Sequence, residues 1–424
     1  MNVNFAVECG TCGKKTNCRV GMSNRKVQPF RFNCQDCGSP IDMTFRAEGT
    51  DIVGAKRIER FEPFDSKTNF VDLHLDFPVS FEPYVMGETP FIRASCRIGR
   101  VEMDLHTARL NALNDEIDKF RHFGVLLKLY AKGKIAPFTQ NCATIFDITA
   151  LSDKPEDINA ALYLLIAKVM SPFAYPRQNE DSVQLFQNAL FQTGIKRHAI
   201  DDFIEEVVAT GFLKNLQLDC LEIYPRILAA ELPMRPALFL DFDKEYEQTP
   251  IPMRVSTHQF EQYKDLFKDI SEIISRQFVL IAAMNNLQKR GNHNAFLPGV
   301  GVTNSGKGFA PTGIGTFADV TFGQKQEFID DPWYQMMDGA IDNHLRNAIA
   351  HYKAEYDEIN QIVTYYPKRE GIKQEKAEQT FFLEFMRRLL VAYREMHRLH
   401  HLIKNLFYYR FMVMKASTLS AFII

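Results

Sequence analysis

The sequence predicts a mainly helical protein with a small β-rich N-terminal part, α+β overall. Three observations predict this fold class. Two Cys-x-x-Cys pairs lie within the first fifty residues, apolar and polar residues alternate from residue 69 to residue 77, and apolar residues recur at helical spacing from residue 101 onward. With 424 residues and 46% apolar content, we expect three domains, at residues 1–50, 51–255 and 256–424.

Composition narrows the functional classes. The formal net charge is only −2, so a global basic field for nucleic acid is excluded and any polyanion site must be local. No basic and apolar leader precedes residue 9, and apolar runs such as residues 160–167 and 278–284 fall short of the ~20 residues that cross a bilayer. We therefore expect a cytoplasmic protein that does not enter membranes.

The cysteine pairs are the clearest local signal. Cys9, Cys12, Cys34 and Cys37 form two Cys-x-x-Cys-Gly units, and four thiolates complete the tetrahedron that structural zinc prefers. We predict a Zn²⁺ ion held by these four residues, with a short hairpin between the pairs, and the region resembles a zinc ribbon. Reduced dithiols without metal are the alternative. Cys18 is interpreted as a bystander, although it could replace a ligand.

The role of this N-terminal region stays open at the sequence level. Its basic residues favour contact with nucleic acid or protein, whereas a small metal-stapled module packed on the rest of the chain is an equal alternative. The basic residues are Lys14, Lys15, Arg19, Arg25, Lys26 and Arg31.

A half-buried strand and then helices are expected next. At residues 69–77 apolar side chains alternate with Asp72, His74 and Asp76, which predicts one buried and one solvated face. Helical spacing follows over residues 101–130, from Pro155, near 179–192 and near 198–210. Residues 91–250 show no recognisable catalytic constellation and do not indicate a function, so a sensor or regulatory role for the middle domain stays open.

The last third contains the candidate catalytic residues. A long helix is predicted over residues 259–289, a second from Asp331 and Pro332 through residue 351, and a final one over about residues 375–414. On the second helix Asn347 and His351 are four residues apart and share a face, with Arg346 at the edge of that face. The expected buried stripe of this helix is Trp333, Met337, Ile341, Leu345 and Ala348.

These three residue types suit RNA cleavage without a metal ion. Such a site must neutralise the scissile phosphate and move the 2′-hydroxyl proton. Arg346 supplies a permanently charged fork, the imidazole of His351 can serve as an acid or a base, and Asn347 can orient either one. The spacing alone is weak evidence. With 25 Arg and 11 His in 424 residues, an Arg followed by a His five positions later is about as likely as not to occur by chance. The helical context carries the interpretation.

Residues 342–352 resemble the HEPN superfamily of helical, mostly metal-independent endoribonucleases, whose motif is Arg, a polar residue and, after a short spacer, His. The likeness covers roughly residues 256–424 and points to members found in prokaryotic toxin and abortive-infection (antiviral) systems. It implies a homodimer with a composite active site, 2′,3′-cyclic phosphate products, and catalytic roles for Arg346, Asn347 and His351. Some members place a tyrosine two residues after the histidine, whereas Tyr352 follows His351 directly, so a role for Tyr352 stays open.

Other interpretations remain. Asn347 and His351 could brace a helix end, with Arg346 paired to a carboxylate such as Asp342. The domain could be a non-catalytic dimerising or RNA-binding sensor, or the ribbon could serve a nucleic-acid-binding regulator. A regulatory or trigger partner could bind through residues 1–255.

The last helix could carry an RNA surface or a dimer interface. From residue 384 to residue 415 it has seven Lys or Arg against two acids. The aromatic and histidine residues interleaved with this charge are His397, His400, His401, Phe407, Tyr408, Tyr409 and Phe411.

Overall fold

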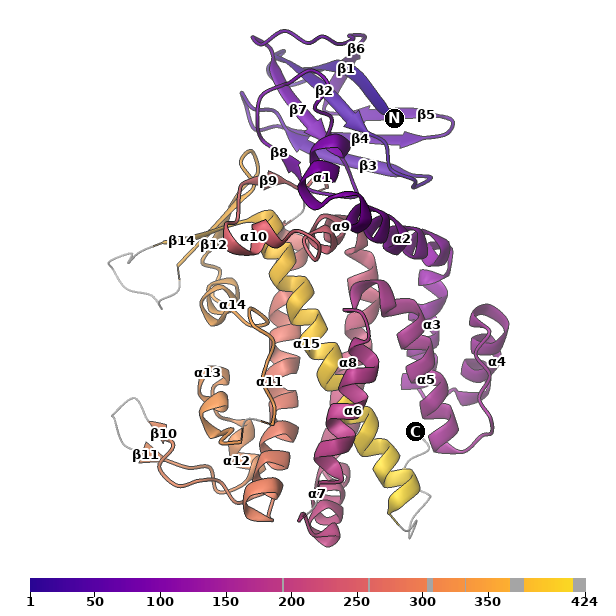
Figure 1. The fold of residues 1–424 in the computed structure, drawn as a ribbon, viewed down its shortest axis with the longest axis vertical. Helices are drawn as coiled ribbons and strands as arrows, with labels where there is room; N and C mark the ends of the chain where they lie inside the picture. Colours follow the sequence, from indigo (N-terminus) through magenta and orange to yellow (C-terminus); the bar gives the residue numbers. More distant parts are fainter. Residues whose placement is uncertain (193, 258–259, 303–307, 332, 367–376, 415–424) are drawn as a thin grey trace. The chain divides into compact units, whose positions relative to one another are not determined.

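The computed structural model describes residues 1–192, 194–257, 260–302, 308–331, 333–366 and 377–414 (Figure 1). About 54% of the described residues are helical, and small β-sheets lie at the N-terminus. The prediction of a mainly helical α+β fold is therefore confirmed.

The chain divides into two compact units, each built from three separate segments. Unit 1 comprises Met1–Ile117, Ala229–Phe267 and His344–Leu390, and unit 2 comprises Asp118–Leu228, Lys268–Asn343 and Val391–Ile424. Unit 1 draws on all three ranges expected as domains, so its borders do not coincide with those at 50/51 and 255/256. The three-domain division stays a prediction.

Unit 1 begins with strands in two sheets. They are β1 (Asn2–Cys9), β2 (Lys15–Gly21), β3 (Gln28–Asn33), β4 (Pro40–Arg46), β5 (Gly49–Val53), β6 (Ala55–Ile58) and β7 (Asn69–Leu73). One sheet has the order β6-β1-β2-β7 and the other the order β3-β4-β5. β1 pairs with β2 and β3 with β4, both antiparallel. The predicted hairpin between the cysteine pairs is therefore wrong, because β2 and β3 each pair across their own Cys-x-x-Cys turn.

The strand expected from residue 69 exists as β7, which pairs in parallel with β2, but it is not half-buried. Asp72, His74 and Asp76 are only 5%, 4% and 8% exposed. Arg19 donates to both carboxylate oxygens of Asp72 at 2.7 and 2.6 Å, and Arg235 donates to Asp76 at 2.7 Å. Buried arginines rather than water thus cover the polar face, which a period-two pattern cannot reveal.

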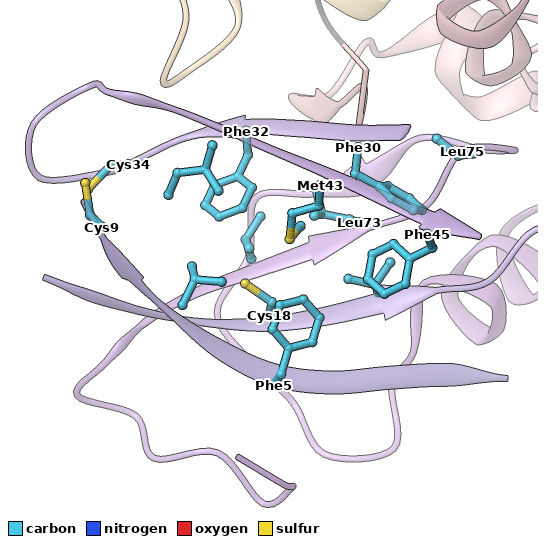
Figure 2. Close-up of a cluster of buried hydrophobic side chains, with 14 residues drawn as sticks. Phe5, Cys9, Cys18, Phe30, Phe32, Cys34, Met43, Phe45, Leu73 and Leu75 are labelled. Atoms are coloured by element: carbon cyan, nitrogen blue, oxygen red, sulfur yellow. The ribbon is translucent and has the colours of Figure 1, made fainter. Parts of the chain in front are cut away.

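The two sheets share one apolar core, in which aromatic rings from β1, β3 and β4 gather around Met43 and Leu73 (Figure 2). Burying each large side chain contributes about 1.5–3 kcal/mol. The buried members are Phe5, Val7, Cys9, Cys18, Val20, Phe30, Phe32, Cys34, Ile41, Met43, Phe45, Val71, Leu73 and Leu75. The ribbon-like part therefore has a hydrophobic core of its own in addition to its cysteines.

The remainder of unit 1 mixes short strands with helices. Its elements are β8 (Val79–Ser80), α1 (Pro90–Ile98), α2 (Arg100–Glu116), α9 (Glu231–Phe239), α10 (Lys244–Gln248), β9 (Met253–Arg254), α14 (Asn343–Ala350), β12 (Ala354–Asp357), β13 (Ile362–Tyr365) and β14 (Glu378–Phe381). β12, β13 and β14 form a three-stranded antiparallel sheet. Two long helices, α11 (Phe260–Arg290) and α15 (Phe382–Tyr408), begin in unit 1 and continue into unit 2.

Unit 2 is mainly helical. Its further elements are η1 (Ile117–Lys119), α3 (Phe120–Ala131), α4 (Ile135–Phe146), α5 (Pro155–Met170), η2 (Ser171–Phe173), α6 (Gln178–Leu190), α7 (Arg197–Ala209), α8 (Phe212–Ala229), β10 (Gly301–Val302), β11 (Gly308–Phe309), α12 (Ile314–Ala318), α13 (Phe322–Lys325), η3 (Gln326–Phe328) and η4 (Tyr409–Val413). The helices expected near 155, 179–192, 198–210 and 259–289 are confirmed by α5, α6, α7 and α11. The run at 101–130 is interrupted at η1, so it forms α2 and α3 rather than one helix.

Candidate functional sites

The first cysteine pair occupies the turn between β1 and β2. Cys9 ends β1, and its backbone carbonyl accepts a hydrogen bond from Gly13 N at 2.9 Å, while Cys9 N donates to Lys14 O at 2.9 Å. Gly13 has φ +70°, a left-handed conformation that costs glycine little. This backbone turn directs the side chains of Cys9 and Cys12 to one side.

The second pair repeats the same turn between β3 and β4. Gly38 N donates to Cys34 O at 2.8 Å, Cys34 N donates to Ser39 O at 2.9 Å, and Gly38 has φ +73°. The glycine after each second cysteine is therefore required by the geometry, and the two turns are near copies of one another.

The two turns bring the four sulfurs together. Cys9 Sγ lies 3.7 Å from Cys37 Sγ, Cys12 Sγ lies 3.7 Å from Cys34 Sγ, and all four atoms lie within 4.8 Å of one another. These separations are far too long for a disulfide and match the edge of roughly 3.8 Å that four thiolates make around an ion at a 2.3 Å metal–sulfur distance. The predicted ligand set is thus assembled and could hold a metal ion.

Local hydrogen bonding favours the thiolate form at Cys37, whereas the pKa of Cys12 is raised to about 12 and burial raises the pKa of the Cys34 thiol. The Ser39 hydroxyl lies 3.4 Å from Cys37 Sγ, and together with the Ser39 backbone it lowers the pKa of Cys37 to about 6. A thiolate is the form of cysteine that binds metal. Four cysteine sulfurs are a common ligand set for a metal ion, so the donor atoms as well as their geometry fit one.

Cys18 does not belong to the cluster. It is fully buried on β2 among the core residues, and its Sγ lies 3.7 Å from Thr16 O (Figure 2). Burial raises the pKa of the Cys18 thiol. Within the described residues, the metal-capable group consists of Cys9, Cys12, Cys34 and Cys37, so Cys18 lies outside it.

The helix expected to begin at Asp331 is much shorter than predicted. Residues 333–342 are not helical, and α14 spans only Asn343–Ala350; Pro332, expected at the first helical position, lies outside the described residues. Side chains of other elements bind backbone amides of this segment: Asp331 N donates to Asn285 Oδ1 at 2.8 Å and Met337 N to Glu395 Oε2 at 3.2 Å. The prediction that one helix buries Trp333, Met337, Ile341, Leu345 and Ala348 on a common face is therefore wrong, because the first three precede α14.

Arg346, Asn347 and His351 lie on or just beyond α14 in unit 1. Arg346 Nη1 donates to Asn347 Oδ1 at 2.9 Å, and Asn347 O accepts from His351 N at 3.0 Å. His351 is exposed, whereas Arg346 and Asn347 are partly buried. Burial lowers the pKa of the Arg346 guanidinium, which nevertheless remains charged at neutral pH. The helical turn thus brings the three residues into one local group at the surface.

Tyr352 and His344 lie next to this group in the sequence. Tyr352 is 93% exposed with φ +56° and follows the end of the helix, so it marks the exit of the chain into β12. His344, on the first turn of α14, lies 3.0 Å from the carboxylate of Glu378 on β14.

The last helix was predicted to carry an RNA surface or a dimer interface, but its central residues cannot form an RNA surface because they are buried. Arg394, His397, His400 and His401 are 0%, 2%, 1% and 4% exposed. Tyr224 OH lies 2.9 Å from His397 Nδ1 and 2.7 Å from His400 Nδ1. Burial lowers the pKa of all three histidines, to about 4 for His397, so they are neutral internal residues of unit 2.

Sequence reasoning missed one contact beside the cysteine cluster. Asn33 Nδ2 donates to Glu358 Oε2 at 2.5 Å and to Gly38 O at 2.7 Å. Asn33 and Glu358 are 325 positions apart, and no local pattern in the sequence links them.

Among the helices in the described part of the chain, none combines the length and the apolar content needed to cross a bilayer. Comparison of the chain with family models, with curated protein sequences and with solved structures finds no match. The proposed function therefore rests on the residues of the two candidate sites.

Proposed function

We propose that the protein is a metal-independent endoribonuclease of HEPN type, with Arg346, Asn347 and His351 as its catalytic residues. The observation that carries the proposal is the hydrogen bond of 2.9 Å from Arg346 to Asn347, with the exposed His351 one helical turn further on. In this proposal Arg346 is the cation, Asn347 the orienting amide and His351 the proton carrier.

In the proposed reaction the 2′-oxygen of RNA forms a bond to the adjacent phosphorus and the bond from phosphorus to the 5′-oxygen breaks. Neutral His351 takes the 2′-hydroxyl proton, and the 5′-oxygen receives a proton from the protonated imidazole of the second copy's His351. Arg346 stabilises the charge that develops on the phosphate oxygens, and Asn347 holds the guanidinium in orientation. The products are a 2′,3′-cyclic phosphate and a 5′-hydroxyl end.

We further propose that the ion in the four-cysteine cluster is zinc in a structural role. Four sulfur ligands are typical of structural zinc, and they leave no open position for water or substrate. The reaction above therefore routes no step through the ion.

The biological setting follows from the same proposal. An unrestrained cellular ribonuclease is harmful, so we propose a cytoplasmic toxin or antiviral abortive-infection effector of a prokaryote. It acts as a homodimer and is held in check or triggered by a partner that binds through residues 1–255.

Replacement of His351 by Ala tests the proposal. General acid–base groups contribute about 10²–10⁴-fold, so we expect His351→Ala to lose cleavage and toxicity by that factor while fold and dimer persist. His344→Ala, which removes an exposed histidine from the same helix, is the matched control and should retain activity. Mapping of cellular RNA ends after induction provides the measurement.

Two outcomes would contradict the proposal. Full toxicity of the His351→Ala variant would show that His351 is not the catalytic proton carrier. A prompt and reversible requirement for Mg²⁺ in purified cleavage would indicate another class of nuclease.

A non-catalytic HEPN-like RNA-binding or dimerising module is the second candidate. The shortness of α14 favours it, because the bond from Arg346 to Asn347 could simply brace a helix end. This alternative predicts RNA retention without cyclic-phosphate ends and indifference to His351→Ala. A zinc-ribbon regulator would instead show salt-sensitive binding to duplex DNA that is lost with the cysteines.

A further inference from the structure

The turn between β12 and β13 rests on the second cysteine turn of unit 1. Asn33, which directly precedes Cys34, uses one amide nitrogen to bind both Gly38 O, at 2.7 Å, and Glu358 Oε2, at 2.5 Å. The side chain of Ile359 also approaches Gly38, with its Cδ1 3.9 Å from the position that a Cβ on this glycine would take. The β12–β13 turn thus touches the backbone that positions Cys34 and Cys37.

A second set of contacts holds the same turn from its other end. Gln361 is fully buried, accepts from Val255 N at 2.8 Å and donates to Val255 O at 2.9 Å. The next residue, Ser256, accepts from Arg31 N at 2.7 Å, and Arg31 lies on β3, the strand that leads into Cys34. Both ends of the turn are therefore fixed to the β3–β4 hairpin.

A short stretch of chain connects this turn to the candidate catalytic residues. β12 starts three residues after His351, and its four residues pair with β13 in the register Ala354 to Tyr365 and Asp357 to Ile362. Lys353 N donates to Ala348 O at 2.8 Å and so joins β12 to the end of α14. A displacement of the turn would therefore be transmitted along β12 to the segment from Arg346 to His351.

We propose that metal occupancy of the four-cysteine cluster sets the order of the Arg346–His351 segment, with Glu358 as the positioning residue that couples the two. The ion takes no part in the reaction, yet its removal loosens the second cysteine turn, frees Asn33 and releases the β12–β13 turn. The consequence for catalysis rests on the proposed ribonuclease function, whereas the coupling itself does not.

Amide hydrogen exchange on the full chain, with zinc bound and after its removal, tests the coupling directly. We expect peptides that cover residues 346–365 to exchange roughly tenfold faster without zinc, the loss expected for one hydrogen bond to a charged group. Peptides from α7 in unit 2 serve as the internal reference. Unchanged exchange at 346–365, in a sample where the cysteine peptides respond to zinc, would overturn the proposal.

Variants separate coupling from general loss of structure. Glu358→Ala with zinc bound should retain one zinc per chain and still show the faster exchange at residues 346–365, so the test holds even if removing zinc unfolds unit 1. Glu358→Gln keeps an oxygen acceptor for Asn33 and should restore protection, and Glu355→Ala, which removes an exposed carboxylate from β12, should match wild type. Wild-type exchange in Glu358→Ala would assign no positioning role to this residue.

The same variants distinguish this inference from the proposed function. If the function holds, Glu358→Ala lowers kcat for RNA cleavage and Glu358→Gln recovers it. If His351→Ala leaves cleavage unchanged, the ribonuclease assignment fails, while the exchange data still decide whether the metal site controls this segment.

Discussion

Arg346 binds its own neighbour, and that bond limits which substitutions can replace it. The guanidinium donates to Asn347 Oδ1 at 2.9 Å, which ties the plane of the fork to the orientation of the amide. A planar fork can contact two phosphate oxygens at once, whereas an ammonium group acts as a point charge.

We therefore predict that Arg346→Lys retains the charge but loses about 10- to 100-fold in single-turnover RNA cleavage, and that Arg346→Ala loses more. The rate is measured with enzyme in excess over RNA and well above the dissociation constant, so that weaker binding does not contribute. Arg46→Lys, a change at an arginine of β4, is the control for arginine replacement as such. Equal rates for Arg346→Lys and wild type would argue that the arginine is a brace and not a phosphate ligand.

Among the elements, the two cysteine turns differ from the other candidate features because local residues define them completely. Each turn needs a two-residue gap between cysteines and a glycine that adopts positive φ. Both requirements are visible in the sequence, which is why the ligand set could be predicted.

This difference predicts a clear contrast between two cysteine substitutions. Cys12→Ser removes an exposed ligand and should abolish stoichiometric zinc binding and lower the thermal midpoint of unit 1, because binding and folding of such sites are linked. Cys18→Ala removes a core sulfur and should destabilise the protein by about 1 kcal/mol while retaining zinc. The measurements are the zinc content and the thermal unfolding of the two purified variants. Loss of zinc in Cys18→Ala would indicate that Cys18 is a metal ligand.

Other elements depend on partners that lie far away in the chain. α14 starts late because Asn285 and Glu395 bind the backbone amides of Asp331 and Met337, and neither partner is close in sequence. Asp72 on β7 and Asp76 just beyond it are buried because Arg19 and Arg235 reach them from distant segments. The spacing of apolar and polar residues predicts correctly how side chains alternate, but it does not predict what covers each face. The polar face at residues 69–77 was therefore predicted to be exposed to solvent.

The same limit applies to α15 and to the candidate catalytic group. Basic and aromatic residues on a helix suggest a nucleic-acid surface, yet the three histidines of α15 meet tyrosines and amides of unit 2. The placement of Arg346, Asn347 and His351 close together on a helix is a local property that the sequence predicts, whereas the contact from Asn33 to Glu358 needs the tertiary structure.

At the scale of the whole molecule, five buried histidines couple stability to pH. Burial lowers the pKa of His74, His106 and His397 to about 4, and those of His400 and His401 well below the ordinary value. The unfolded chain, with ordinary histidines near pKa 6.5, therefore binds more protons than the folded chain below that pH.

We predict that the free energy of unfolding is nearly constant with respect to these histidines above pH 6.5 and falls as the pH drops toward 4. Each histidine contributes up to about 1.4 kcal/mol per pH unit within that window. Urea unfolding at pH 7.5, 6.5, 5.5 and 4.5 measures the slope. His397→Gln should reduce it, whereas the exposed His351→Ala should not; a slope that is the same in His397→Gln would contradict the assignment.

The interleaved segments of unit 1 have a consequence for its biosynthesis. Asn33 and its partner Glu358 are 325 positions apart, so at typical rates of translation roughly 16 to 65 s separate their emergence from the ribosome. The cysteine turns can form early, but the β12–β13 turn that docks on them is made only after the intervening residues have been synthesised. Throughout that interval the nascent chain lacks an assembled candidate catalytic segment, which would delay any toxicity until Glu358 has emerged.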